Sequence, residues 1–431
     1  MTSETLPTIA YTEHRLENGM RVILAPDDAV PIAALSIWYD VGSRDEQPGL
    51  TGLAHLFEHM MFQGSANVAK GEHFAIVQSA GGTLNATTWW HRTNYFESAP
   101  SHHLETLVWL EADRLASLPV AITQENLDNQ RDVVKNERRQ RYDDMPYGGW
   151  LEALQERLFP DGHPYQHATI GSMDDLTAAS VEDCKAFFKT HYAPNNAVIS
   201  VAGDFEPDIA LKMIESHFGP IPANPKLPTK PEVRLEPGGL GVRAEFQDKL
   251  APLPRLFFGH RGPGPDDDRF SAIEMASAAL SSGGTRSTRI YKTLVREREL
   301  CQDASFFAFG TNGAALVGGH ATPRPGVDLE AVEKAFLEVV DSVANDPPKG
   351  DELDRLRALK ERQTIEAIFQ TCDQRADALS EAATVHGDPR EVNEILPKLL
   401  AVTSEQIGEA AAAFLNADNR VTLTYIPEGK A

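Results

Sequence analysis

The sequence predicts an α+β fold made of two homologous domains, each a mixed, mostly antiparallel sheet with helices packed on it. Three observations lead to this prediction: a proline-rich stretch near the middle of the chain, a repeated plan on its two sides, and strand-like runs that bracket helical ones. The chain has 431 residues, which is enough for two or three domains.

The proline-rich stretch is GPIPANPKLPTKPEVRLEPGG, residues 219–239, and it holds six prolines. Proline disfavours helix and lacks a backbone N–H, so such a stretch tends to extend as a linker. We therefore predict a first domain over residues 1–220, a linker over 221–238 and a second domain over 239–431.

The two sides of the linker repeat one plan. Residues 104–140 and 329–366 each read as a helix, a short break containing proline, and another helix. Residues 176–205 and 399–429 each read as a helix that begins at Ser or Thr, a turn with Asn, and a strand. A duplication of roughly 200 residues is the scale of a domain rather than of a solenoid repeat.

Strands are expected around the helices. The runs RVILAPD, IAALSIWYDVGS and TNYFESAP in the first half combine apolar and β-branched residues in alternation. Between the second and third of these runs stands GLAHLFEHMMF, residues 52–62, whose mostly apolar letters predict a buried helix.

The helix over 52–62 also carries a metal-binding pattern. His55 and His59 lie one turn apart on one face, and neutral imidazoles at this spacing can ligate one zinc ion. Glu58 borders the same face and can deprotonate a water held there. The pattern is H-x-x-E-H. The alternative is a core helix whose histidines are satisfied by backbone carbonyls.

A catalytic zinc site needs three protein ligands and one open position. The third ligand should come from another helix, and residues 126–144 are a candidate. Val134 lies on the apolar face of this segment, and Glu137 lies one helical step beyond it. A single Glu on a helix is otherwise more typical of solvated surface.

Composition and residue spacing argue against several kinds of partner and binding site. The net charge of −23 makes nucleic acid an unfavourable partner. Cys184, Cys301 and Cys372 lie far apart, without C-x-x-C spacing, which indicates small buried side chains rather than disulfides or a thiolate zinc site. Gly283-Gly284 lacks a following Lys-Ser/Thr and predicts a turn rather than a phosphate loop.

The sequence shows no membrane-spanning run and no N-terminal leader pattern. We therefore expect no membrane association and a cytoplasmic location, or a periplasmic one if a leader peptide has been removed.

Several motifs together resemble the pitrilysin-type zinc peptidases, the superfamily that includes insulin-degrading enzyme and the mitochondrial processing peptidase. They are HLFEHMMFQGS, VVKNE around Glu137, GGTLNATTWWHRTNYF (81–96), DMPYG (144–148), HPYQHATIGSMDDL (163–176) and TRIYKTLVRE (288–297). The resemblance covers most of the chain and is nearest to the bacterial processing-peptidase-like members of about 430 residues.

The resemblance implies a ligand set and a fold. His55, His59 and Glu137 would be the zinc ligands and Glu58 the catalytic base. One zinc ion per chain follows, because the second half has no H-x-x-E-H and Gln363 aligns with Glu137. The two domains would face each other across a chamber that admits extended peptides.

The resemblance also implies substrate-binding residues. In this superfamily the substrate adds as a strand to a sheet edge near the Asn-Ala segment, here Asn85 and Ala86. Some relatives carry a Glu seven residues before the third ligand, where this chain has Gln130, which can still hydrogen-bond but carries no charge.

One departure concerns the second half. Active relatives often carry an Arg and a Tyr seven apart that hold the substrate and its developing oxyanion. Arg296 matches the Arg, but the residue seven positions later is Asp303. Several relatives divide the zinc site and the Arg/Tyr pair between two chains.

The sequence therefore predicts a zinc-dependent endopeptidase that hydrolyses peptides or unfolded segments. We expect it to work with a homologous partner subunit as a heterodimer, or as a homodimer. The alternative is a non-catalytic scaffold or regulatory subunit of the same superfamily.

Overall fold

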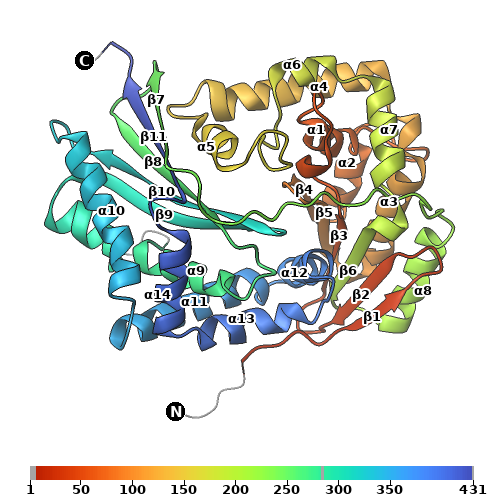
Figure 1. The fold of residues 1–431 in the computed structure, drawn as a ribbon. Coiled ribbons are helices and arrows are strands. Elements are labelled where there is room, and N and C mark those ends of the chain that lie inside the picture. The colour runs from red at the N-terminus through yellow and green to blue at the C-terminus, as the bar shows by residue number, and fades with distance from the viewer. Residues whose placement is uncertain (1–5, 283–285, 430–431) are drawn as a thin grey trace. The chain divides into compact units, whose positions relative to one another are not determined.

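The computed structural model describes residues 6–282 and 286–429 (Figure 1). The turn predicted at Gly283-Gly284 lies outside these residues. Among the described helices, none combines the length and the apolar character needed to cross a membrane.

The first sheet has six strands in the order β1-β2-β6-β3-β5-β4. Neighbouring strands are antiparallel except for β2 and β6, which are parallel. The strands are β1 (Thr12–Arg15), β2 (Arg21–Pro26), β3 (Ile32–Tyr39), β4 (Thr83–Thr88), β5 (Thr93–Pro100) and β6 (Ala197–Gly203). The predicted strands RVILAPD, IAALSIWYDVGS and TNYFESAP are thus confirmed as β2, β3 and β5.

The second sheet has five strands in the order β7-β11-β8-β10-β9. Among the described strands of this sheet, β7 and β11 pair in parallel and the other neighbours are antiparallel. The strands are β7 (Val242–Asp248), β8 (Arg255–Gly262), β9 (Cys301–Thr311), β10 (Ala314–Pro323) and β11 (Arg420–Pro427). Apart from β1, the second sheet repeats the order and directions of the first, which confirms two homologous mixed sheets.

Helices accompany the strands in both halves. Those of the first half are α1 (Leu53–Met60), α2 (Glu72–Ser79), α3 (Leu104–Ser117), α4 (Gln124–Arg138), α5 (Trp150–Leu158), α6 (Met173–Ala178), α7 (Val181–His191) and α8 (Pro207–Phe218). Those of the second half are α9 (Phe270–Leu280), α10 (Leu329–Asn345), α11 (Asp351–Ile368), α12 (Cys372–Val385), α13 (Glu391–Ala401) and α14 (Ser404–Phe414).

The predicted helix starts are confirmed by their caps. The Ser180 hydroxyl accepts a hydrogen bond from the Asp183 N–H at the start of α7. The Thr403 hydroxyl accepts one from the Gln406 N–H at the start of α14. In each case a side chain satisfies a backbone donor that the helix leaves unbonded.

The chain forms two compact units, and each unit takes a segment from the other half of the sequence. One unit contains the chain up to Asn136, residues 168–231 and residues 363–395. The other contains residues 137–167, 232–362 and the chain from Leu396. The predicted division at 221–238 separates homologous halves rather than compact units, so it stays a prediction.

The exchanged segments are equivalent. The chain leaves the first unit at Glu137 and leaves the second at Gln363, the two positions that align in the repeat. The segment that begins at Glu137 supplies α5, which packs on β8 and β11. The segment that begins at Gln363 supplies α12, which packs on β3 and β6, as Figure 1 shows.

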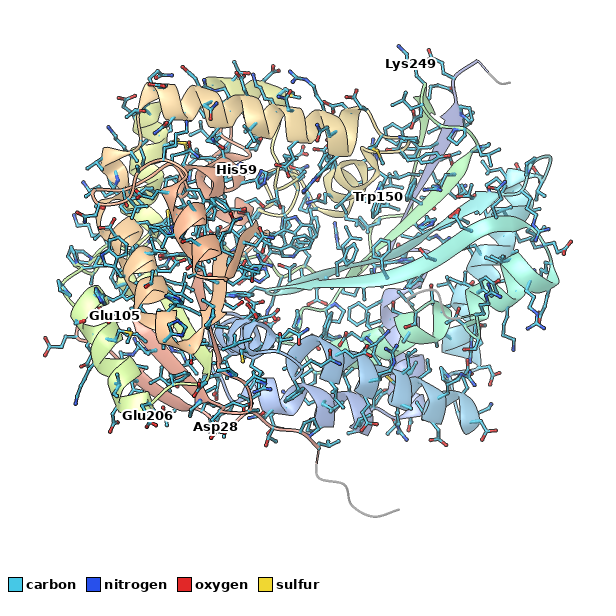
Figure 2. The ribbon with its side chains drawn as sticks, turned by 180° about the vertical axis from the view of Figure 1, so that it is seen from behind. Asp28, His59, Glu105, Trp150, Glu206 and Lys249 are labelled. Atoms are coloured by element: carbon cyan, nitrogen blue, oxygen red, sulfur yellow. The ribbon has the colours of Figure 1, made fainter. Side chains whose placement is uncertain are left out.

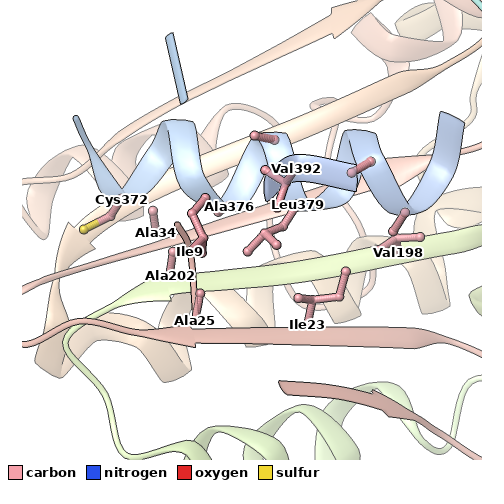
Figure 3. Close-up of a cluster of buried hydrophobic side chains, with 13 residues drawn as sticks. Ile9, Ile23, Ala25, Ala34, Val198, Ala202, Cys372, Ala376, Leu379 and Val392 are labelled. Atoms are coloured by element: carbon pink, nitrogen blue, oxygen red, sulfur yellow. The ribbon is translucent and has the colours of Figure 1, made fainter. Parts of the chain in front are cut away.

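A buried apolar cluster holds α12 on the first sheet (Figure 3). Leu379 is fully buried at its centre, with Ile23 of β2 and Ala34 of β3 on the sheet side. Cys372 also belongs to this cluster, and all three cysteines are buried and free, as predicted.

Candidate metal centre

Helix α1 begins where only glycine fits. Gly52 has φ of 87°, a left-handed conformation that favours glycine, and a Cβ there would lie 2.5 Å from the Ile170 carbonyl oxygen. The carboxylate of Glu46 accepts hydrogen bonds from the N–H groups of Gly52 and Ala54, at 3.0 and 2.7 Å. A carboxylate at this end also complements the helix dipole. These contacts fix the start and direction of the helix.

The apolar face of α1 is fully buried and includes Leu56, Phe57 and Met60. His55 and His59 are half-buried, and Glu58 is only 9% exposed. Figure 2 marks His59 on this helix. The helix therefore has both of the properties read from the sequence: it is a core helix, and it presents one polar edge.

The polar edge gathers ligand atoms of His55, Glu58 and His59 within 4.8 Å of one another. The two imidazole centroids are 4.9 Å apart, and the ring planes are inclined at 78°. Zinc–nitrogen bonds of about 2.1 Å place tetrahedral ligands about 3.4 Å apart, and the spread of these ligand atoms, within 4.8 Å, is compatible with one ion. The chemistry and spacing of these residues fit zinc.

Glu58 is fixed from the neighbouring strand. The Thr88 hydroxyl, at the end of β4, donates a hydrogen bond to Oε2 of Glu58. Helix α1 packs against β4 and β5. Strand β4 is the last strand in the order of the first sheet, so the carboxylate lies beside an edge strand.

Along β4, successive residues point their backbone N–H and carbonyl groups alternately toward β5 and toward the sheet edge. The Trp89 N–H bonds the Arg92 carbonyl at 2.8 Å across the β4–β5 hairpin. Counting back through the register, Thr87 and Asn85 point their backbone groups toward β5, and Ala86 points them toward the edge. In agreement, the Ala86 N–H bonds the Asn85 side-chain oxygen at 2.9 Å. The Asn-Ala segment predicted to bind substrate thus lies on an edge strand beside α1.

Glu137 lies in the last turn of α4. It is the first residue after Asn136, where this segment of the first unit ends. Its side chain is 18% exposed, and Arg141 lies 2.9 Å from its carboxylate. Its role as third ligand stays a prediction. Gln130, two turns earlier, is 8% exposed, and its amide nitrogen donates to Asn129 at 3.0 Å.

Arg296 belongs to the second unit, on a π-helical segment, Tyr291–Glu297, where its side chain is exposed. Asp303 is on β9 and interacts instead with His320, Thr322 and Arg255, at 3.0, 3.2 and 3.5 Å. The role of Arg296 in substrate binding stays a prediction, and Asp303 is held by Arg255, His320 and Thr322.

A second group of potential ligands was missed at the sequence level. His73, Glu97 and Glu111 have ligand atoms within 4.8 Å of one another, and all three are buried. Arg114 binds the Glu111 carboxylate through two nitrogens, and His73 bonds Glu97. Because Arg114 already supplies a positive charge to these carboxylates, we interpret the group as a buried charge network rather than a metal centre. The Glu-x-x-Arg spacing on α3 was its only sequence signal.

Comparison with known proteins defines the family. A family model described as Insulinase (Peptidase family M16) matches residues 21–166, and one described as the peptidase M16 inactive domain matches residues 178–360. The chain belongs to peptidase family M16. The M16 inactive-domain match agrees with the absence of H-x-x-E-H from the second half.

The proteins that this chain is similar to carry different names. Zinc protease PqqE of Helicobacter pylori is 28% identical over 373 residues, which is 83% of this chain and 80% of that protein. The crystal structure of a protease from Helicobacter pylori has the same fold, with a TM-score of 0.89 at 23% identity, covering 97% of this chain and 100% of that chain. Human mitochondrial cytochrome b-c1 complex subunit 1 is 26% identical over 314 residues, 71% of this chain and 64% of that protein.

Proposed function

We propose that this M16 chain is a zinc-dependent endopeptidase that hydrolyses peptides or unfolded segments. The observation that carries the proposal is the position of Glu58, which Thr88 holds at the polar edge of α1, between His55 and His59 and beside the edge strand β4. The zinc protease named among its relatives supports the same chemistry.

In this proposal His55, His59 and Glu137 hold the zinc ion. The bound ion would polarise the scissile carbonyl and lower the pKa of the attacking water. Glu58 accepts the proton of that water and delivers it to the leaving amine. The low exposure of Glu58 keeps bulk water from competing for this proton.

Substrate binding follows from the edge strand. Ala86 directs its N–H and carbonyl groups away from β5, so an extended peptide can pair with them, and backbone pairing tolerates many sequences. The Asn85 side chain, which bonds the Ala86 N–H, must move away when the peptide binds. The proposal includes the chamber that the family resemblance implies, in which the extended peptide would bind.

The proposal includes a homologous partner subunit. Asp303 stands where active relatives often have Tyr, and its carboxylate would repel a developing oxyanion. A partner chain in a heterodimer, or a second copy in a homodimer, would supply the Arg/Tyr pair. Full hydrolytic activity of the purified chain as a monomer would rule out a required partner.

The test combines metal analysis with turnover of an internally quenched peptide. The chain purified without chelator should hold about one zinc ion, and Glu58→Gln should keep that zinc but lower turnover at least about 100-fold. If Glu58→Gln cleaves as fast as the parent, the mechanism is wrong.

The second candidate function is a non-catalytic scaffold or regulatory subunit. The similarity to cytochrome b-c1 complex subunit 1 favours it. The intact set of His55, Glu58, His59 and Glu137 argues against it. A purified chain without near-stoichiometric zinc and without turnover, alone or with its partner, would support the scaffold.

A further inference from the structure

Arg92 does not extend into solvent from the β4–β5 hairpin but folds back along it. Its Nη1 donates to the Thr87 carbonyl at 2.9 Å, to the Asn94 side-chain oxygen at 3.0 Å and to the Thr87 hydroxyl. Its guanidinium carbon lies 4.8 Å from the ring centroid of Trp38. One nitrogen makes all three hydrogen bonds while the guanidinium lies over the indole, and a lysine ammonium lacks the planar group that makes the second of these contacts.

The residues that hold Arg92 are in turn held by one carboxylate of α12. Oδ1 of Asp377 accepts hydrogen bonds from the Trp38 indole at 2.7 Å, from the Asn94 amide at 2.8 Å and from the Ser36 hydroxyl at 3.0 Å. The cation–π contact and the Asn94 contact of Arg92 therefore both rest on Asp377. This network joins β3, β5 and α12 to the hairpin.

The same network reaches Glu58 through two consecutive residues. Thr87 and Thr88 share one planar peptide unit, so the hydrogen bond from Arg92 to the Thr87 carbonyl also fixes the direction of the Thr88 N–H group. Successive side chains in a strand point to opposite faces, and Thr88 turns its hydroxyl toward Glu58. Arg92 thus holds one side of β4 while Glu58 is bonded on the other.

Stability alone is a weak explanation for this arrangement. The three acceptors of Arg92 are neutral oxygens, and burying a cation against neutral acceptors gains little free energy of folding. Burial lowers the pKa of Arg92, and the carboxylates Asp377, Glu381 and Glu58 act in the opposite direction.

We propose that Arg92 is a positioning residue for the M16 reaction, because it locks the β4–β5 hairpin so that Thr88 holds Glu58 and Ala86 keeps its backbone at the edge. In this role Arg92 acts through Thr88 and Ala86 rather than on the substrate or the metal directly. This inference rests on the proposed peptidase function.

The first test is steady-state kinetics of Arg92→Gln, with Arg92→Lys as a milder variant. We expect Arg92→Gln to keep its zinc, lower kcat/KM by about 10- to 100-fold and change both constants, with kcat reduced and KM raised. The kcat/KM of Arg92→Lys should lie between those of Arg92→Gln and the parent.

Arg21→Gln is the matched control. Arg21 also ties the first sheet to α12, through a 2.7 Å bond to the Ala383 carbonyl, but it lies on β2, away from the hairpin. A purely structural role would make Arg92→Gln behave like Arg21→Gln, with a lower Tm and an unchanged KM. That result, or parental kcat and KM in Arg92→Gln, overturns the inference.

A double-mutant cycle tests the route through Thr88. If Arg92 acts on Glu58 through Thr88, Arg92→Gln should lower kcat much less in a Thr88→Val background than in the parent. Full additivity of the two losses in kcat contradicts this route.

Chemical rescue and hydrogen exchange separate the inference from the proposed function. Millimolar guanidinium should restore part of the activity of Arg92→Ala, and ammonium at the same ionic strength should not. In Arg92→Gln, backbone amides of residues 83–88 should exchange faster than in the parent, whether or not the chain turns over peptide. A parent that is inactive both alone and with its partner subunit refutes the peptidase function, whereas parental exchange at 83–88 refutes the hairpin lock.

Discussion

The Thr88 hydroxyl and the Glu58 carboxylate, thirty positions apart in the chain, are joined by a hydrogen bond at Oε2. The bond engages Oε2 of Glu58 and so orients its carboxylate from the strand side. It also ties the base to the edge strand that we propose receives the substrate. The base and the substrate backbone would therefore keep one relative position through the reaction.

Thr88→Val should lower kcat about 10-fold or more, because valine keeps the β-branched shape but removes the donor that orients Glu58. Zinc content should not change, and peptide kinetics with metal analysis on one preparation checks both. Thr83→Val on the same strand is the control, since the Thr83 hydroxyl bonds Ser98 instead. Equal effects of the two substitutions would contradict a specific role for Thr88.

Much of this site could be predicted from sequence because its signals are local. The four-residue spacing of His55 and His59 places them on one helix face wherever that helix lies. The strand TNYFESAP has the bounds of β5, since alternation and β-branching act over a few residues. The repeated plan of the halves likewise predicts two sheets of one topology.

The contacts that orient Glu58 could not be predicted in this way. Trp38 and Asp377 are 339 positions apart and meet only because α12 packs on the first sheet. Nothing in the local sequence marks residues 363–395 as part of the first unit. Such pairings are set by tertiary packing, so the roles of Thr88, Arg92 and Asp377 emerged from the structure.

Ala86→Pro should raise KM about 10-fold or more while the protein stays folded and keeps its zinc. The Ala86 N–H faces the sheet edge, so proline removes a donor that the substrate would use but not a donor of the β4–β5 ladder. Circular dichroism, metal analysis and kinetics together check this prediction.

Asn85→Pro provides the contrast, because Asn85 directs its backbone toward β5. Proline at this position removes a ladder bond and should lower Tm and turnover together. If Ala86→Pro leaves KM unchanged, substrate does not pair with this part of the edge.

Leu379→Ala should lower the free energy of unfolding by about 2–5 kcal/mol, because it opens a cavity beneath α12 where Leu379 is fully buried. Urea unfolding of the intact chain measures this loss. The control is Ile209→Ala on α8, where the side chain is 60% exposed and a change of at most about 0.5 kcal/mol is expected. Equal losses would show that α12 does not stabilise the first sheet.

The buried network around Glu97 should make stability depend on pH. Burial raises the pKa of the carboxyls of Glu97 and Glu111 to about 7. Because Arg114 pairs directly with Glu111, we assign the retained proton to Glu97. Burial also lowers the pKa of His73 to about 3, so this imidazole is neutral and can accept the proton of Glu97.

Glu97→Gln should therefore stabilise the protein at pH 8 relative to the parent, and less so at pH 5. The folded state holds a proton on Glu97 between the unfolded value near 4.5 and the folded value of about 7, so the stability contributed by this group is lost as pH rises through that window. Glutamine imitates the protonated carboxyl at every pH and avoids a loss on the order of 3 kcal/mol. Urea unfolding at pH 5 and pH 8 measures the difference, with Glu105→Gln as a control because the Glu105 side chain is 71% exposed. A Glu97→Gln variant that is less stable than the parent by the same amount at both pH values would show that Glu97 is ionised in the folded protein.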